Sequence, residues 1–323
     1  MTAVLALGAL TACGSGSAST TTNSSGSNDV TIAAYANQAT TTTITVPVVD
    51  SIRNELPKSV LDSGKLVIGV GALPSGFPPL AYVGNDQKTL TGVEPDLGRL
   101  VAAVFGVKAD VENASWENMF VRIQSGQFNV GFSNITDTEL RKQQGLDFAS
   151  YREDNLAFEV LKSNTWNFDN NYENLAGKTV AVGSGTNQEK ILLEWQSKLK
   201  SEGKTLTVKY FNDLNSTYLA LDSGRIDAYL VPNPDVQYHV EQSANTPQPT
   251  RSAGTYSGAG SSLQGLIAAT TKHGNGLAKP LADAINYLIQ HGQYAKWLST
   301  YDLSNEAVAK SEVNPPGLPL SNS

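Results

Sequence analysis

The stretch KLVIGV, residues 65–70, decides the fold class together with the segments that follow it. Its apolar and β-branched residues predict a buried strand. The next segment, GALPSGFPPLAYV at 71–83, is rich in glycine and proline and is expected to be a loop. Beyond it, Leu97, Leu100, Val101 and Val104 recur at helical spacing, and 107–112 predicts a second strand. Strand, helix and strand in this order predict an α/β fold with mostly parallel sheets.

The same alternation continues along the chain. A helix from about Trp116 to 125, a strand at 128–132 and a polar loop at 133–138 come next. A second series begins near residue 178 with strands at 178–182, 206–210 and 226–231, and two helices are expected at 277–291 and 293–300. A chain of 323 residues exceeds what one core usually holds, so two lobes are expected. Ligands of such sheets bind beyond the carboxyl ends of the strands, where the loops 71–82 and 133–138 lie.

Composition excludes several classes of function. The net charge of −7 and the pI near 5.0 argue against a nucleic-acid partner, because phosphate binding needs a basic face. Cys13 is the one cysteine, so no intramolecular disulfide can form. With only three histidines, far apart in the sequence, a Cys/His zinc cluster is excluded as well. We therefore expect neither a metal nor a cofactor.

The N-terminal residues predict export and anchoring. AVLALGALTA, residues 3–12, is too short to span a bilayer but fits the apolar part of a signal peptide. The run ends in Leu10-Thr11-Ala12-Cys13, which resembles the lipobox of bacterial lipoproteins, so 1–13 is predicted to be a signal with lipidation at Cys13. An ordinary secretion signal that contains a cysteine is the alternative. Residues 14–49 are rich in Ser, Thr and Gly at their start and are predicted to form a flexible tether to the outer face of the membrane.

Eight further stretches, taken together in their order and spacing, resemble the amino-acid-type (family 3) periplasmic solute-binding proteins of ABC transporters. They are SGKLVIGV, FPPLAY, LTGVEPDLGRLVAAVFGVKADV, SWENMFVRIQSGQFNV, ITDTELRKQQGLDFASYRE, LAGKTVAVGSGTNQ, LDSGRIDAYL and LADAINYLIQHGQYAKWLSTY. The resemblance implies a two-lobe, type II periplasmic-binding-protein fold with a hinge of two crossing strands. Lobe 1 would comprise 63–160 and 263–303, lobe 2 would comprise 161–262, and residues 304–323 would form a tail. The end of this tail, PPGLPLSNS at 315–323, is expected to be disordered.

The resemblance also implies a function. The protein is expected to be a monomer that captures a small carboxylate-bearing solute, such as an amino acid, between its lobes. An ABC transporter permease would be its partner. Two alternatives remain open: a lyase similar to cyclohexadienyl dehydratase on the same scaffold, which would need a general acid such as Glu94, Asp137 or Glu139 in the cleft, and a sensory ligand-binding protein.

Arg141 is the first candidate binding residue. It lies near a helix N-terminus, where the helix dipole disfavours a cation, so an anionic partner is indicated. Its planar guanidinium suits a carboxylate, and the resemblance places a carboxylate clamp here. A solvated surface arginine is the alternative. Ser133, Asn134 and Thr136 offer hydroxyl, amide and backbone groups to the same anion, unless they serve only as caps and turns.

Further candidates complete the predicted site. Phe77 and Trp116 fall where the family places aromatic rings against the ligand, although core packing is the alternative. Thr186 and Asn187 begin a second-lobe helix that could donate N–H groups to the carboxylate. Pro232 stands where family members carry an acidic residue for the ligand ammonium, and proline has no side-chain acceptor. Asp235 or Asn233 would have to replace it, or the ligand lacks a conventional α-ammonium.

Overall fold

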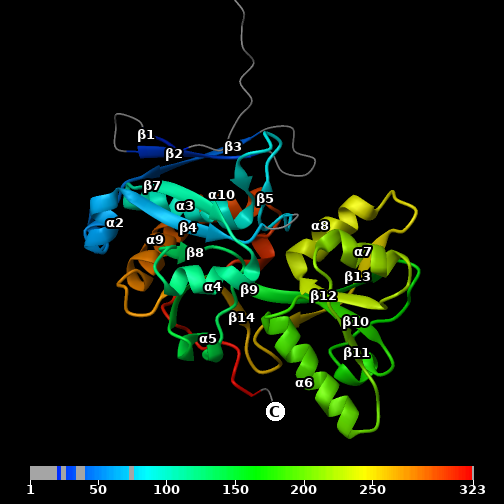
Figure 1. Cartoon of the computed structure of the whole chain (residues 1–323). Coiled ribbons are helices and arrows are strands. Elements are labelled where there is room, and N and C mark those ends of the chain that lie inside the picture. The colour runs from blue at the N-terminus through cyan, green and yellow to red at the C-terminus, as the bar shows by residue number, and fades with distance from the viewer. Residues whose placement is uncertain (1–19, 23–26, 34–40, 73–75, 322–323) are drawn as a thin grey trace, which may run out of the picture.

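The structure is a computed structural model that describes residues 20–22, 27–33, 41–72 and 76–321. The chain forms two α/β lobes side by side (Figure 1). In that view lobe 1 lies on the left and holds the start of the described chain, and lobe 2 lies on the right in green and yellow. Residues 1–13, with the predicted signal and Cys13, lie outside the described residues.

Lobe 1 is built around the strand that the sequence predicts at 65–70. That prediction is confirmed as β4 (Lys65–Val70), which lies between β7 (Lys108–Asn113) and β8 (Val130–Gly131) and pairs in parallel with both. β14 (Gly265–Lys272) pairs antiparallel with β8, and a hairpin of β5 (Tyr82–Val83) and β6 (Leu90–Thr91) precedes the first long helix. The helices of lobe 1 are α1 (Asp50–Arg53), α2 (Lys58–Ser63), α3 (Val93–Phe105), α4 (Trp116–Gln124), α5 (Glu139–Gln143), α9 (Ala278–Gln290) and α10 (Gln293–Thr300).

Lobe 2 repeats the alternation. β10 (Thr179–Val182) lies between β11 (Thr207–Lys209) and β12 (Ala228–Pro232) and pairs in parallel with both. The other elements of lobe 2 are the short helix Tyr172–Leu175, α6 (Asn187–Ser201), α7 (Leu214–Asp222), α8 (Asn233–Ser243) and β13 (Thr250–Ser257). The parallel prediction therefore holds for the centre of each lobe.

The hinge differs from the expected pair of crossing strands. β9 (Leu146–Leu161) is one continuous strand that runs from one lobe into the other. Its first part pairs antiparallel with β14, as far as Asp154 opposite Gly265, and its second part pairs antiparallel with β12 and β13. The return connection is not a continuous strand, because residues 258–264 between β13 and β14 form a turn. The predicted lobe boundary at 160/161 is therefore wrong, and residues 155–161 already belong to the sheet of lobe 2.

The predicted flexible tether at 14–49 is wrong for the described part of that segment. β1 (Thr20–Thr22), β2 (Ser27–Ile32) and β3 (Thr42–Pro47) form an antiparallel sheet above lobe 1 (Figure 1). The alternating apolar residues of β2 and β3 are at most 2 % exposed and join the core of lobe 1; they are Val30, Ile32, Ile44 and Val46. The alternation of apolar and polar residues in β2 and β3 is present in the sequence, but the many threonines make it hard to recognise.

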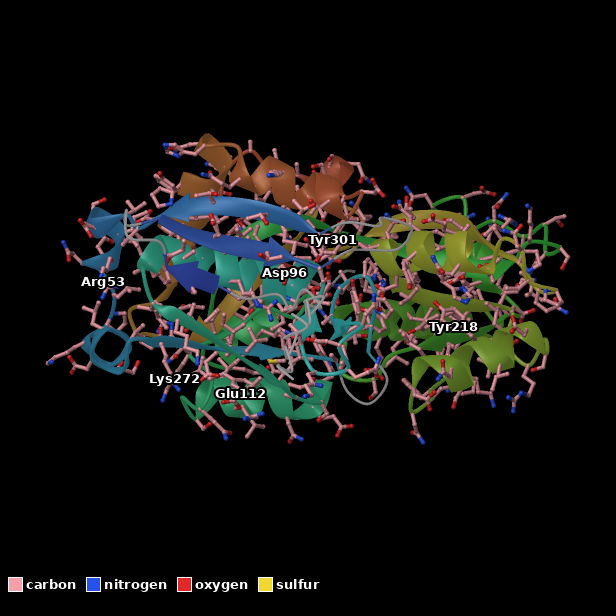
Figure 2. All side chains as sticks on the ribbon, turned by 90° about the horizontal axis from the view of Figure 1, so that it is seen from above. Arg53, Asp96, Glu112, Tyr218, Lys272 and Tyr301 are labelled. Atoms are coloured by element: carbon pink, nitrogen blue, oxygen red, sulfur yellow. The ribbon has the colours of Figure 1, made fainter. Side chains whose placement is uncertain are left out.

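A buried polar contact fastens the end of α10 to α3. Asp96 accepts hydrogen bonds from the Tyr301 hydroxyl at 2.6 Å and from the Thr91 hydroxyl at 3.2 Å. It also pairs with Arg99 on the next turn of α3. Figure 2 shows Asp96 and Tyr301 close together in lobe 1, with Tyr218 away in the other lobe. The two ends of lobe 1 are thereby joined although 205 residues separate them.

The tail 304–323 is described through Ser321, so the expectation of disorder for PPGLPLSNS is wrong for residues 315–321. It begins with the short helix Ser304–Glu306 and continues along lobe 1. Glu306 is fully buried and forms an ion pair with Arg152 of β9. Val313 forms a bridge with Ala149, and Leu318 forms one with Thr138. Within the described ranges, no helix is both long and apolar enough to cross a membrane.

Candidate functional site

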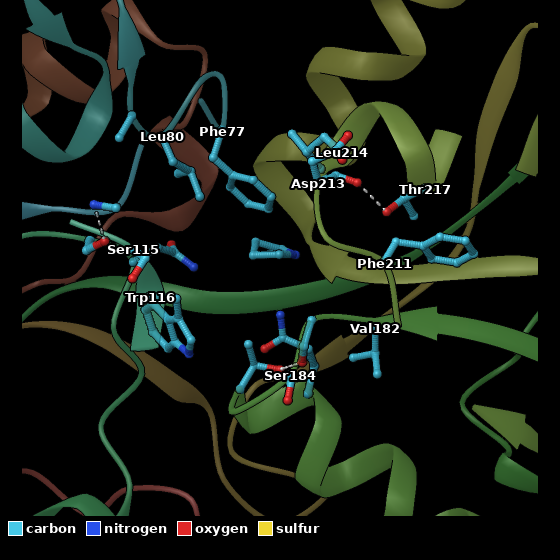
Figure 3. A pocket seen from close by; sticks show the side chains of 18 of the residues that line it. Phe77, Leu80, Ser115, Trp116, Val182, Ser184, Phe211, Asp213, Leu214 and Thr217 are labelled. Carbon is cyan, nitrogen blue, oxygen red and sulfur yellow. Dashed lines mark hydrogen bonds between the residues drawn. The ribbon is translucent and has the colours of Figure 1, made fainter. Parts of the chain in front are cut away.

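A cavity of about 450 Å³ lies between the two lobes. Lobe 1 contributes the loop after β4, the start of α4 and the loop after β8, and lobe 2 contributes the β10–α6 turn and the loop before α7 (Figure 3). Its volume falls in the range of small-molecule sites. Six predicted binding residues line it: Phe77, Trp116, Ser133, Asn134, Thr186 and Asn187. Arg141, Thr136 and Asp235 are not among the lining residues.

Aromatic side chains from both lobes form much of the wall. Phe77 packs against apolar clusters of both lobes, and the indole N–H of Trp116 donates to the Gly185 carbonyl across the cleft at 3.2 Å. Lobe 2 adds three rings that the sequence reasoning missed: Tyr210, Phe211 and Tyr229. Tyr210 is the last residue of the strand predicted at 206–210 and Phe211 follows it, so the rule that ligands bind beyond strand carboxyl ends could have identified them.

The N-terminus of α6 opens onto the cavity. Thr186 is the N-cap of this helix, since its hydroxyl accepts from the Glu189 N–H at 3.1 Å and donates to the Gly183 carbonyl at 2.7 Å. Asn187 and Gln188, the first two helical residues, also line the cavity. Backbone N–H groups at these positions have no partner inside their own helix, and the helix dipole favours negative charge there. This end of α6 can therefore accept an anion.

Ser133 and Asn134 line the cavity, but their side chains already have partners in the protein. The Ser133 hydroxyl accepts from the Gly71 N–H at 2.8 Å. Asn134 has a left-handed backbone with φ of 50°, and its amide oxygen accepts from Arg152. Ser133 thus joins the two loops of lobe 1 at the cavity wall, and Asn134 joins its loop to β9.

Arg141 is buried, and it lies next to the cavity wall rather than on it. Its guanidinium donates to the Thr136 carbonyl at 2.8 Å and lies over the rings of Phe120 and Trp116, at 4.9 and 5.4 Å from their centroids. Burial lowers the pKa of Arg141 to about 10, with Asp154 and Asp137 opposing the shift, so it is charged at neutral pH. The expectation that Arg141 lines the cleft is not met in this conformation, nor is it solvated at the surface.

Several residues predicted to bind a ligand carboxylate instead surround a carboxylate of the protein itself. Asp154 of β9 is 2 % exposed, and its Oδ2 accepts from the Thr136 hydroxyl at 2.7 Å and from the Asn187 amide at 3.0 Å. The positive charge of Arg141 also favours the ionised form of this carboxyl and so lowers its pKa. Burial raises the pKa of Asp154 to about 6 against these contacts. Three groups predicted to hold a ligand carboxylate therefore surround Asp154 at the hinge.

The structure shows where Pro232 and its two possible substitutes, Asp235 and Asn233, lie. Pro232 lines the cavity at the end of β12 and is the N-cap residue of α8. Asp235, one of the two predicted substitutes, is 3 % exposed, and within the described part of the chain neither of its carboxyl oxygens has a hydrogen-bond partner. Burial raises its pKa well above the ordinary value, which favours the neutral form. The side chain of Asn233 points instead to Glu306, at 3.4 Å.

The charged residues on the described cavity lining are acidic. No lysine or arginine is among its residues, whereas Glu94, Glu117 and Asp213 are. Glu94 accepts hydrogen bonds from Tyr151 and Arg152, so both of its oxygens are used. Asp213 caps α7 through the Ser216 N–H at 2.9 Å, a bond that holds the pKa of Asp213 below its ordinary value. Among the described residues, no group of three or more His, Cys, Asp or Glu side chains is placed to hold a metal ion.

Two lobes joined through a hinge around a ligand-sized cavity define a class of hinged solute-binding proteins. The chain belongs to the bacterial extracellular solute-binding proteins, family 3, whose sequence pattern matches residues 68–303.

Curated relatives and solved structures agree with this membership. The L-cystine-binding protein TcyJ of Escherichia coli K12 is 32 % identical over 177 residues, 54 % of this chain and 62 % of that protein. The arginine-binding protein ArgT of Corynebacterium glutamicum is 28 % identical over 60 % of this chain and 62 % of its own. The chain thus spans 62 % of the length of these relatives. The structure of an ancestral arginine-binding protein bound to arginine matches with a TM-score of 0.62 and 27 % identity, over 74 % of this chain and 98 % of that one.

Proposed function

We propose that this protein captures a small amino acid, or a related solute with both a carboxylate and a positive charge, and delivers it to an ABC-type importer. The observation that carries the proposal is the inter-lobe cavity, lined by rings and polar groups of both lobes. The cystine- and arginine-binding relatives support an amino acid as the solute class. Its place would be outside the cytoplasmic membrane, with Cys13 as the site of a lipid anchor.

The ligand carboxylate would bind at the N-terminus of α6. Asn187 and Gln188 line the cavity there and offer backbone N–H groups without partners in their own helix. Arg141 would act indirectly, because it contacts the ring of Trp116 and the Thr136 carbonyl while Asp154 occupies the neighbouring anion position. This assignment replaces the direct Arg141 clamp that the sequence predicts.

The positive charge of the ligand would face the acidic and aromatic part of the wall. Asp213 is ionised at neutral pH and partly exposed, and Phe211 and Tyr210 stand beside it on the same loop. Aromatic faces and a carboxylate both attract an ammonium or guanidinium group. This loop would therefore take the role that an acidic residue at position 232 has in typical family members.

Ligand binding would favour closure of the lobes. A molecule in the cavity contacts groups of both lobes, so it stabilises the conformations in which the lobes lie together. The proposal is for binding without catalysis. Glu94 is the one general-acid candidate of the sequence that lines the cavity, and its carboxylate oxygens already accept from Tyr151 and Arg152.

A thermal-shift screen tests the proposed function. Amino acids, betaines, amines and small carboxylates would each be added in large excess to the purified protein. We expect an amino acid with a positive charge to raise the melting temperature, because a ligand at about 100 times its Kd stabilises the folded state by about 2.7 kcal/mol. A melting temperature raised by no amino acid, or only by solutes that lack a carboxylate, would contradict the proposal.

Asp213→Asn tests the assignment of the positive charge. Asparagine caps helices as well as aspartate does, so α7 and the melting temperature should be unaffected while the charge is lost. We expect the Kd of the amino acid to rise about threefold to tenfold, as measured by calorimetry. Asp222→Asn, at the other end of α7, is the matched control. Equal affinity of the Asp213 and Asp222 variants would place the positive charge elsewhere.

A further inference from the structure

The chain after residue 303 contacts both lobes and lies outside the segment that matches the family. We call residues 304–321 the C-terminal strap. In Figure 1 it is the red segment that leaves lobe 1 and ends in the space between α5 and α6. We propose that this strap clasps the two lobes and biases them, before any ligand binds, toward the conformation that encloses the cavity.

The strap is held to lobe 1 by backbone pairing. The Ser150 N–H donates to the Glu312 carbonyl at 3.0 Å, and the Glu312 N–H donates to the Ser150 hydroxyl at 2.9 Å. Further along, the Glu139 N–H donates to the Leu318 carbonyl and the Leu318 N–H donates to the Asp137 carbonyl, both at 3.0 Å. Leu318 therefore has its backbone fixed to the loop and helix of lobe 1 that carry Arg141.

The same residue has its side chain in lobe 2. Leu318 is 1 % exposed and belongs to the apolar cluster that contains Val182, Ile191 and Leu192. The ammonium of Lys190 on α6 donates to the carbonyl of Pro319, the next residue. At the start of the strap, Glu306 pairs with Arg152 and accepts from the Asn233 amide of α8 at 3.4 Å. The strap thus contacts lobe 2 near both of its ends.

The sequence of the strap favours this docking. A Cβ atom on Gly317 would lie 2.5 Å from the carbonyl oxygen of Asp137, a separation that forces the backbone to move, so glycine permits the close approach. Pro315, Pro316 and Pro319 restrict the free chain and lower the entropy that docking removes. The segment NPPGLPL therefore combines a stiff chain, one small residue and one apolar anchor.

The position of the contact gives the strap a mechanical role. Lys190 lies three residues beyond Asn187, on the helix whose N-terminus forms part of the cavity wall. An opening motion that moves α6 away from the 137–139 loop must withdraw Leu318 from the lobe 2 cluster or detach it from lobe 1. Because full burial of a leucine is worth roughly a tenfold change in equilibrium or more, the strap shifts the ratio of closed to open molecules by that order. This effect does not depend on which solute the cavity takes.

The distance between the lobes in ligand-free protein tests the proposal. Spin labels would be placed by Val121→Cys on α4 and Leu219→Cys on α7, two exposed positions in opposite lobes, in a full chain that also carries Cys13→Ser. Pulsed electron paramagnetic resonance then gives the distance distribution. We expect Leu318→Ser to reduce the ratio of closed to open molecules roughly tenfold. Leu320→Ser, at a 50 % exposed position two residues on, should leave the distribution as it is.

A second variant guards against a folding defect. Lys190→Met removes the bond to Pro319 but keeps the apolar stem, and it should move the distribution in the same direction by a smaller amount. Thermal unfolding of each variant shows that it is folded before the distances are compared. If the Leu318 and Lys190 variants, both folded, give the distribution of the Leu320 control, the strap does not couple the lobes and the proposal is overturned.

Discussion

Arg152→Met is expected to lower the free energy of unfolding by about 3–5 kcal/mol. The Arg152 side chain is 1 % exposed, and its guanidinium pairs with Glu306 and with Glu94, the latter at 3.2 Å. Although burial alone would lower the pKa of Arg152, these two carboxylates raise it above its ordinary value. Removing the cation leaves two buried carboxylates uncompensated, and it also removes one of the contacts between the strap and β9. Denaturant unfolding followed by circular dichroism measures the loss.

Lys58→Met is the matched control for that experiment. Lys58 pairs with Asp62 on the surface, where its side chain is 84 % exposed, so its loss should change the free energy of unfolding very little. An Arg152→Met variant as stable as the Lys58 variant would show that the buried network is not needed for the fold. The simultaneous substitution of Arg152, Glu94 and Glu306 by apolar residues should recover part of the stability, because none of these three charges then remains without its partner.

Trp116→Ala is expected to weaken ligand binding about 30-fold, which corresponds to about 2 kcal/mol. The indole lines the cavity, donates to Gly185 of lobe 2 and lies under the guanidinium of Arg141. Its loss removes a wall of the site, a contact between the lobes and the packing that holds Arg141 in place. Calorimetric titration of the amino acid found by the thermal-shift screen gives the ratio of dissociation constants.

Val121→Ala controls for changes to the same helix. Val121 lies five residues further along α4 and is 61 % exposed, so this substitution should leave the affinity unchanged. A Trp116→Ala variant that binds as tightly as the Val121 variant would mean that the ligand does not contact the wall between α4 and the β10–α6 turn.

Local patterns predicted the centre of each lobe but not the hinge. The sequence predicts β4 at its true residues, because a short run of β-branched residues packs best as a buried strand. β9 was missed as an element, since YREDN in its middle reads as a polar loop. Arg152 in that segment is buried only because carboxylates distant in the sequence neutralise its charge. Glu94 lies 58 residues from Arg152, and Glu306 lies 154 residues away. Hydrophobic periodicity within a short stretch of sequence contains no information on ion pairs between residues so far apart.

The sequence likewise predicts some residues of the candidate site and misses others. Phe77, Trp116, Ser133 and Asn134 reach the cavity because loops beyond strand ends must meet there. The sequence predicts an anionic partner for Arg141, and the negative charge of Asp154 acts on it. Spacing cannot distinguish a ligand carboxylate from Asp154 of the same chain. The sequence predicts disorder for the end of the strap because prolines and glycine are frequent in PPGLPLSNS. The buried position of Leu318 depends on a surface that folding creates.

One titration addresses most directly whether a single solute is held by both lobes. The same amino acid would be titrated into the wild type, Trp116→Ala of lobe 1, Phe211→Ala of lobe 2 and the double variant. Each single variant should weaken binding about tenfold or more, and the double variant should show no measurable heat at millimolar solute. A Phe211→Ala variant with the wild-type dissociation constant would mean that lobe 2 does not touch the solute, and capture between the lobes would then be wrong.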